Sequence, residues 1–377
     1  MKSFAGLTLL ANNRSLDCAC SRTKLAALHT KRVTVYDIAK RVGVSHTTVA
    51  LALRNNHRIS EARRKQIQRL AEEMGYEPDP FLASLASYRA QIVHSAKIQS
   101  AIAWLNHWEQ PERLRGAYQE FDAYWRGAQT AAKRFGYRLD EIRWEAGYTA
   151  KRFEQILLAR GIRGVLVPPH MRAPDWGDFD WGKFSVIRFG LSVPTPDSQL
   201  VTADQLRAVL RAVRRIKELG YQRIGLVMPE DSDLRLGGNF IGGFASARQF
   251  LKLPALPPFL VDERCYMDKP EKCAMLLQKW LKRHRPDALL VFITQVPGML
   301  RKLGYRIPQD IAVAGTGIDV PVDAGLDQHS EAIGRMAVEM LVSQINLNER
   351  GEPTDPCRIL IESRWRDGSS MPPAKRR

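Results

Sequence analysis

Four small polar residues open a short predicted helix and are the residues of this 377-residue chain best suited to direct chemistry: Ser45, His46, Thr47 and Thr48. Hydroxyl and imidazole groups donate or accept hydrogen bonds, and the edges of DNA bases present matching groups in the major groove. Leu51 lies one turn further along and offers only apolar contact, which suits a thymine methyl group. Residues of these types could therefore contact base edges if the helix lay in a major groove. For His46, an exposed histidine without a role is the alternative.

The charge of the chain favours a polyanionic partner. The sequence contains 57 Lys and Arg residues against 40 Asp and Glu residues, a formal net charge of +17. Residues 1–100 hold 16 basic and 7 acidic residues, so this first quarter carries about half of the excess. Nucleic acid is the first partner that such a charge indicates, and an anionic membrane surface is the second. The alternative is a solvated basic face without a partner.

Three short helices are predicted around the polar run. Thr34, followed three residues later by an acidic residue, has the spacing of a capping box, and Gly43 is suited to end the first helix. Ser45 opens the second helix, and Ser60 opens a third that runs to Met74. One face of each helix can contribute to a small core: Val35, Ile38, Val42, Val49, Leu53, Ile67 and Leu70. The tight first turn predicts the steep crossing of a helix-turn-helix.

The region 33–78 resembles the N-terminal headpiece of the lactose-repressor (LacI/GalR) family, through the run VTVYDIAKRVGVSHTTVALALRNNHRIS and the EARRKQIQRLAEEMGYEPDP that follows it. The resemblance implies a helix-turn-helix DNA-binding headpiece whose second helix lies in the major groove. It implies that three residues read bases: His46, Thr47 and Leu51. It places four residues at backbone or mixed contacts: Thr34, Ser45, Thr48 and Arg54. The basic residues expected to neutralise phosphates, without sequence choice, are Arg58, Arg63 and Arg64.

Residues 79–99 are expected to form a hinge helix and linker. In the family this region orders on operator binding, pairs with its dimer mate and inserts a leucine into the minor groove. Leu85 falls at that leucine, and an apolar wedge between base steps kinks DNA. Asp79 and Ala83 replace the polar and basic residues of the family pattern, so the resemblance leaves the phosphate contact to Arg89. An ordinary apolar linker helix is the alternative.

From residue 100 onward the chain alternates predicted strands and helices. Strands are expected at 101–105, 137–143, 164–167, 185–189, 223–228, 288–293 and 311–314. Helices are expected at 121–135, 150–160, 204–219, 241–251, 269–283, 296–303 and 331–345. This alternation predicts an α/β architecture of parallel sheets covered on both faces. A break rich in Pro and Asp at 191–199 predicts a division into two lobes.

Residues 100–366 resemble the two-lobed, periplasmic-binding-protein-like domain of the same family, in phrases such as IKELGYQRIGLVM and LGYRIPQDIAVAGTGID. The resemblance implies dimerisation and a small-molecule effector, sugar-like in many members, bound between the lobes. The match fails at the pocket, where Phe240 and Gly317 stand at positions that are polar in sugar-binding members. A less polar effector, a different binding mode or no effector are the alternatives. The candidate effector contacts are Asn106, His107, Trp108, Phe240, Thr294 and Gln295.

Enzymatic, metal-binding and membrane-spanning functions find little support. The sequence has no GxxxxGK[ST], HExxH or GxSxG motif, so neither a catalytic centre nor a cofactor is expected. Its five cysteines have no zinc-type spacing and are odd in number, which indicates a reducing compartment rather than a disulfide framework. No apolar run approaches the ~20 residues that span a bilayer.

The ends of the chain are expected to be disordered. Residues 1–32 are read as an extension, or as the result of a misassigned translation start, and residues 367–377 as a tail. The apolar stretch at 4–11 is only about as long as the minimum for a secretory signal and is followed at once by polar residues.

Together these patterns predict a cytoplasmic, homodimeric transcriptional repressor that binds a near-palindromic operator and responds to an effector. An exported solute-binding protein and an enzyme on the same scaffold are the two alternatives.

Overall fold

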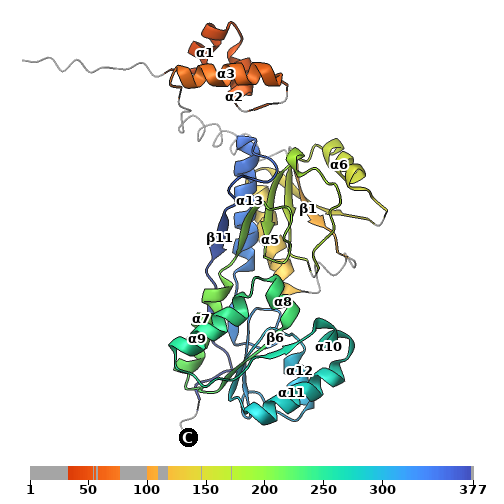
Figure 1. Ribbon diagram of the computed structural model, residues 1–377, viewed down its shortest axis with the longest axis vertical. Coiled ribbons are helices and arrows are strands. Elements are labelled where there is room, and N and C mark those ends of the chain that lie inside the picture. Colours follow the sequence, from red (N-terminus) through yellow and green to blue (C-terminus); the bar gives the residue numbers. More distant parts are fainter. Residues whose placement is uncertain are drawn as a thin grey trace, which may run out of the picture. The chain divides into compact units, whose positions relative to one another are not determined.

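The computed structural model describes residues 33–53, 55, 56, 58–76, 100–108, 118–145, 147–170 and 172–374. The predicted N-terminal extension, the hinge helix with Leu85, and Arg54 lie outside these residues. The chain divides into two units, one up to Pro78 and one from Asp79 onward. Figure 1 labels the elements of both units.

The first unit is the headpiece, and it contains the three predicted helices: α1 (Val35–Val42), α2 (His46–Leu53) and α3 (Glu61–Glu73). The predicted capping box is present at α1. The Thr34 N–H donates to Asp37 Oδ2 over 2.8 Å, and the Asp37 N–H donates to Thr34 Oγ1 over 3.4 Å. Gly43, with φ of +72°, ends the helix in the left-handed conformation that glycine adopts without strain.

Small and medium-sized residues form the headpiece core: Ile38, Ala39, Val49, Ala52, Ile67 and Ala71. Three other predicted core residues pack at its edge: Val35, Val42 and Leu53. Leu70 is half-buried and lies outside this cluster, so its assignment to the core is wrong. Ala71 takes the interior position on α3, which lets the three helices approach closely. Ser60 precedes α3 but its side chain makes no capping hydrogen bond.

The second unit contains two lobes, each built on one six-stranded sheet. The sheet of the N-terminal lobe has the strand order β11-β5-β4-β3-β1-β2, and its pairings are parallel. Its strands are β1 (Ser100–Asn106), β2 (Tyr137–Arg143), β3 (Gly164–Val167), β4 (Ser185–Phe189), β5 (Gln199–Ala203) and β11 (Arg358–Ile361).

The sheet of the C-terminal lobe has the order β12-β10-β9-β8-β6-β7 and is parallel except where β12 pairs with β10. Its strands are β6 (Ile224–Pro229), β7 (Phe259–Val261), β8 (Ala288–Val291), β9 (Ala312–Gly315), β10 (Gly325–Asp327) and β12 (Arg364–Arg366).

Helices cover the faces of both sheets. The N-terminal lobe has α5 (Gln119–Arg134), α6 (Ala150–Ala159), α13 (Ser330–Leu347) and the short 3-10 helix Trp181–Lys183. The C-terminal lobe has α7 (Gln205–Glu218), α8 (Glu230–Arg235), α9 (Asn239–Phe250), α10 (Glu263–Asp268), α11 (Pro270–His284) and α12 (Val296–Lys302). Between β3 and β4 no long helix forms, and Trp176 and Phe179 cover the sheet there instead.

All the strands and helices predicted from residue 100 onward are present. The elements that sequence reasoning misses are β5, β7, β10, β11, β12, α8 and α10. Each is at most six residues long, so its hydrophobic pattern spans too few residues to define a period.

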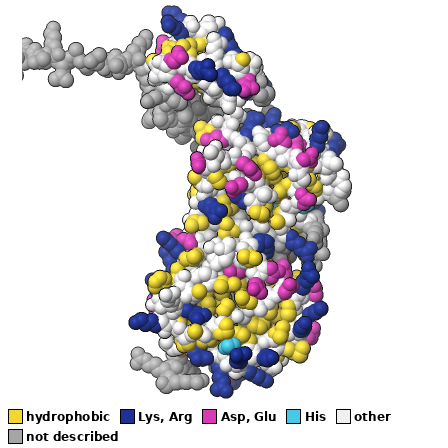
Figure 2. All heavy atoms as spheres, in the orientation of Figure 1, with side chains coloured by type: hydrophobic (Ala, Val, Ile, Leu, Met, Phe, Trp, Pro, Cys, Tyr) yellow, Lys and Arg dark blue, Asp and Glu magenta, His cyan; other side chains and the backbone are white. Residues whose placement is uncertain are grey.

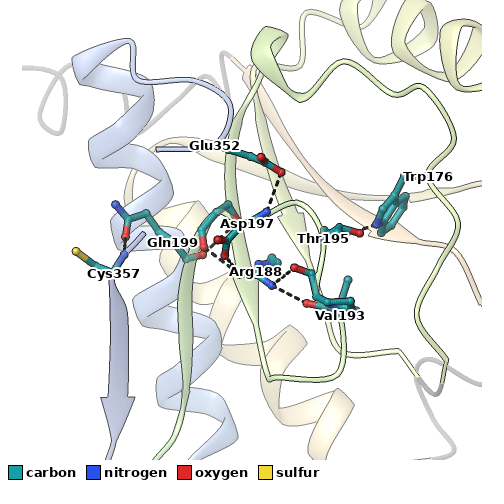
Figure 3. Close-up of polar contacts among 10 residues, drawn as sticks. Trp176, Arg188, Val193, Thr195, Asp197, Gln199, Glu352 and Cys357 are labelled. Atoms are coloured by element: carbon teal, nitrogen blue, oxygen red, sulfur yellow. Dashed lines mark hydrogen bonds and ion pairs between the residues drawn. The ribbon is translucent and has the colours of Figure 1, made fainter. Parts of the chain in front are cut away.

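The predicted lobe boundary at residues 191–199 is wrong, because this segment joins β4 to β5 within one sheet. Within residues 118–374 the chain passes between the lobes after β5, after β10 and after β11. The buried Arg188 of β4 holds the 191–199 connection in place (Figure 3). Its guanidinium donates to the carbonyl oxygens of Val193 and Pro194, each over 2.7 Å, and pairs with Asp197.

Residues 367–374 pack on the C-terminal lobe, so the predicted disorder of the tail is wrong for this stretch. Met371 is buried in the lobe core. The Ser369 and Ser370 N–H groups donate to the Asp323 carboxylate over 2.7 and 2.8 Å, and the Ala374 N–H donates to the Leu219 carbonyl. A short polar run has no periodic signal, and only these tertiary contacts order it.

Two glycines allow α5 and α13 to pack backbone against backbone. A Cβ built on Gly334 of α13 would lie 2.0 Å from the Tyr124 carbonyl oxygen of α5. A Cβ built on Gly127 of α5 would lie 1.8 Å from the Glu331 carbonyl oxygen of α13. Because backbone atoms cannot move aside as side chains can, this crossing requires glycine at both positions.

We expect Gly334→Ala to lower the free energy of unfolding by about 1–3 kcal/mol or more, because the methyl group must push the two helices apart. Urea unfolding monitored by circular dichroism measures the change. Gly242→Ala in α9 is the matched control, since a Cβ there meets no atom within 4 Å. The control should be neutral or more stable by up to about 1 kcal/mol. Equal destabilisation of both variants would contradict the close crossing.

Candidate functional site

The amino-terminal turn of α2 presents its polar residues to solvent. Ser45, His46 and Thr47 are exposed, while Val49 and Ala52 of the same helix are buried in the headpiece core. The Thr48 N–H donates to Ser45 Oγ over 3.1 Å, so Ser45 acts as the helix cap. The helix is therefore anchored by its apolar face, and its start is exposed to solvent.

The other predicted contact residues lie around this turn. Leu51 and Thr48 are half-buried, and Thr34 is exposed at the start of α1. Sequence reasoning missed Tyr36, whose side chain is 67% exposed and whose ring stacks on the His46 ring at 4.8 Å. An exposed aromatic residue in the first turn of α1 was the available signal. The stack restricts the orientation of the imidazole and adds a second flat surface beside it.

The three arginines predicted to neutralise phosphates differ in their hydrogen-bond partners. Arg58 is exposed, and its backbone N–H is held by Asn56. The Arg63 guanidinium donates to Gln66 within α3. The Arg64 guanidinium donates to the Asn55 carbonyl oxygen over 3.1 Å and so also supports the loop after α2. Figure 2 shows Lys and Arg side chains on the visible face of the headpiece, with Asp and Glu among them.

A cavity of about 210 Å³ lies between the two lobes of the second unit. Its apolar lining includes Phe121, Leu191, Leu236, Phe240, Phe292 and Val320. Its polar lining includes Glu120, Tyr124, His170, Ser192, Thr202, Gln205, Arg235, Thr294, Thr316, Asp319 and Gln328. The volume is below the ~300–1,000 Å³ of sites for drug-sized ligands. The cavity therefore suits a small molecule with an apolar face and a few polar groups.

Of the predicted effector contacts, Phe240 and Thr294 line this cavity. Trp108 lies one layer behind the wall, with its ring against Phe121. Asn106 is buried and its amide donates to Glu141, and His107 packs its ring against Trp144 and Trp176. The Gln295 side chain contacts Met267 instead.

Sequence reasoning missed the charged lining residues. Glu120 and Asp319 fall at a helix start and in a loop, where an acidic residue is common and carries no signal by itself. Arg235 ends α8, a helix too short for the hydrophobic pattern to reveal. Two acids and one base meet here only because both lobes contribute to one cavity.

The two acids form a clasp across the lobe junction. Asp319 of the C-terminal lobe accepts the N–H groups of Gln119 and Glu120 at the start of α5, over 2.6 and 3.3 Å. In return, Glu120 accepts the Ile318 N–H over 3.0 Å and a hydrogen bond from the Ser330 hydroxyl. Asp319 thus caps a helix of the opposite lobe.

Burial raises the pKa of Glu120 to about 7, and the hydrogen bonds from Ser330 and Ile318 only partly oppose this effect. The carboxylates of Asp319 and Asp327 raise it further. Burial also raises the pKa of Tyr124 on the next turn of α5. Tyr124 therefore stays neutral, and Glu120 is only partly ionised near neutral pH.

His170 is held as a neutral imidazole. Burial lowers its pKa to about 4. Its Nε2 accepts the His107 N–H over 3.0 Å, so the proton resides on Nδ1, which donates to the Pro168 carbonyl oxygen over 2.8 Å. Both ring nitrogens are used by backbone groups, so His170 shapes the wall and adds no charge to the cavity.

Within the described parts of the chain, no group of three or more His, Cys, Asp or Glu side chains is placed to hold a metal ion. Across those same parts, no helix combines the length and apolar character needed to cross a bilayer.

The clasp predicts a pH dependence of stability. Because the pKa of Glu120 rises from 4.5 to about 7 on folding, the folded state holds this proton more tightly than the unfolded state. The stabilisation is complete below pH 4.5 and is lost as the pH rises through about 7. Glu120→Gln cannot ionise but keeps an acceptor for Ile318.

We expect wild-type stability to fall relative to Glu120→Gln between pH 5 and pH 8, by at most about 3 kcal/mol. Urea unfolding at several pH values measures this difference, in which the opposite contribution of His170 cancels. Glu331→Gln, which removes an exposed carboxylate at the start of α13, is the control. Parallel pH curves for wild type and Glu120→Gln would refute the assignment.

Comparison with known proteins bears on both units. The sequence-family model for bacterial regulatory proteins of the lacI family matches residues 34–79. The family model for the periplasmic binding protein-like domain matches residues 213–371. The HTH-type transcriptional regulator GntR of Escherichia coli K12 is 36% identical over 343 residues, covering 86% of this chain and 95% of GntR.

Two solved structures share the fold. The transcriptional regulator CelR in complex with cellobiose aligns with a TM-score of 0.55 at 20% identity, covering 90% of this chain and 100% of CelR. The lac repressor dimer bound to operator and the anti-inducer ONPF aligns with a TM-score of 0.51 at 16% identity, covering 90% and 99% of the two chains. The match to GntR extends over both units of the chain. The chain therefore belongs to the LacI family of bacterial regulatory proteins.

Proposed function

We propose that this transcriptional regulator represses transcription by binding a near-palindromic operator as a homodimer, with the start of α2 in the major groove. The observation that carries the proposal is the exposure of Ser45, His46 and Thr47 on a helix whose opposite face is buried. A helix that projects its polar end in this way can place donors and acceptors against base edges.

The individual roles follow from chemistry. His46 can donate to or accept from a base edge, Thr47 offers a hydroxyl and a methyl group, and Leu51 suits a thymine methyl group. Arg58 and Arg63 belong to the same unit, and their role in the proposal is to neutralise phosphates. One such small module buries too little surface for specific affinity, whereas two headpieces on two half-sites multiply it. The lac repressor structure, a dimer on its operator, supports this arrangement.

We further propose that the interlobe cavity binds a small effector that controls operator affinity. CelR holds cellobiose, and the cavity here lies at the junction of the two lobes. A ligand that contacts both lobes shifts the equilibrium between their arrangements, and with it the geometry offered to DNA.

Binding rather than catalysis is proposed for this cavity. The imidazole of His170 has both nitrogens engaged by backbone groups, so it is not available as a general base. Glu120 is likewise held by Ile318 and Ser330. Turnover of a ligand that is abolished by a change in the cavity would contradict this view.

The DNA-binding proposal is tested by selecting bound sequences from random duplexes and measuring affinities by gel shift at several salt concentrations. We expect His46→Ala with Thr47→Ala to cost about 1–3 kcal/mol per lost base contact and to change the preferred sequence. Arg63→Ala should weaken all sequences alike and lower the salt slope by about 1.

Lys282→Ala removes the same charge from α11 of the C-terminal lobe and is the control for net charge. It should leave affinity and preference as in the wild type. If the His46 and Thr47 changes leave sequence preference unaltered, α2 is not the reading helix.

A further inference from the structure

We propose that the effector carries a carboxylate and that Arg235 binds it; this rests on the effector role proposed for the cavity. Arg235 ends α8 and lines the cavity from the C-terminal lobe. Its Nη1 donates to the His170 carbonyl oxygen of the N-terminal lobe over 2.7 Å. The guanidinium therefore stands where the lobes meet and already bridges them.

This cation has no anionic partner in direct contact. Within the described residues Arg235 forms no ion pair, and Glu263 and Asp231 act on it only through space. Burial lowers the pKa of Arg235, which reflects the cost of placing its charge away from water. An unpaired cation that is partly desolvated gains most from an anion that arrives with the ligand. The remaining donors of its planar fork match the two oxygens of a carboxylate.

The other charged groups of the cavity are already engaged. Glu120 and Asp319 accept backbone hydrogen bonds across the lobe junction. His170 is neutral because both its ring nitrogens serve backbone groups. Of the described lining residues, Arg235 is thus the cation with donors left for a ligand.

The charged groups that line the cavity also favour a ligand with a single negative charge. A phosphate monoester carries roughly −1.5 to −2 near neutral pH, which is more negative charge than the one guanidinium of Arg235 can balance. A monocarboxylate matches Arg235 alone. The apolar walls formed by Phe240, Phe292 and Leu236 suit a ring or hydrocarbon body, and hydroxyls such as those of Ser192 and Thr202 suit a few polar substituents.

Position 240 also supports the assignment of Arg235 as the residue that binds the carboxylate. This position is polar in sugar-binding members of the family that the chain resembles, and this chain has a buried phenylalanine there. Arg235 comes from a different element, five residues earlier, so it approaches the ligand from another direction. The polar recognition in this cavity is therefore built differently from that pattern.

The test uses the full-length protein and a panel of small monocarboxylates, each with its primary amide, including benzoate with benzamide and cyclohexanecarboxylate with its amide. D-glucuronate with D-glucose adds a hydroxylated pair, and D-glucose 6-phosphate tests a dianion. Isothermal titration in a chloride-based buffer, free of carboxylate and phosphate, measures Kd. We expect at least one carboxylate to bind and its neutral counterpart to bind at least tenfold more weakly.

Arg235→Gln should weaken that carboxylate about ten- to hundredfold, and Arg235→Lys should weaken it less, because the charge remains without the fork. Arg248→Gln is the matched control, since its Nη1 also donates to a carbonyl oxygen, that of Leu256, over 2.7 Å, but it does not line the cavity. It should keep the wild-type Kd. Thermal unfolding of each unliganded variant checks that it folds.

Four results would overturn the inference: no carboxylate binds, the neutral partner binds equally well, the phosphate ester binds more tightly than every carboxylate, or Arg235→Gln keeps the wild-type Kd. If wild-type protein still retards its selected DNA duplex in those cases, the regulator function stands and only the ligand class is wrong. Failure to bind any duplex would instead count against the proposed function.

Discussion

The geometry of the cavity depends on carboxylates that satisfy backbone groups of the opposite lobe. A helix leaves its first N–H groups without partners, and at α5 Asp319 supplies one from across the junction. Glu120, at the start of that same helix, accepts Ile318 in the other direction. The two lobes therefore complete each other's hydrogen bonding, and a molecule between them acts on this junction.

This clasp also explains why so much charge is buried without making the cavity acidic. Burial raises the pKa of Glu120 to about 7, so this carboxyl is only partly ionised near neutral pH, and Asp319 is occupied as a cap. Among the described lining residues, Arg235 is then the cation that a ligand meets. Arg188 holds the 191–199 segment through the carbonyl oxygens of Val193 and Pro194 (Figure 3). Leu191 and Ser192 of this segment line the cavity.

The exposure of the polar start of α2 follows from a different constraint, the small size of the headpiece. Three helices of 8, 8 and 13 residues can bury only a few side chains, and much of their surface remains exposed. Alanines at positions 39, 52 and 71 let the helices approach closely. Because the buried face of α2 is taken by this packing, its polar start is left outside.

Much of this architecture could be predicted from local patterns. The long amphipathic helices and the buried strands repeat their periods often enough to be recognised, as in α7, whose apolar residues lie along one face. Short elements such as β7 and α10 could not, and Leu70 was assigned to a core that Ala71 fills instead. The Pro-rich segment at 191–199 has the composition of a domain linker, yet Arg188 anchors it within one lobe.

Local sequence patterns were enough to predict the helix-turn-helix, the α/β alternation and the polar start of α2, because these features depend on neighbours within a few residues. The lining of the cavity depends instead on long-range contacts. Glu120, Arg235 and Asp319 lie on separate elements of two lobes, and Asp319 meets Glu120 from about 200 positions away in the chain. Such contacts form because the chain passes more than once between the lobes. No local sequence pattern indicates them.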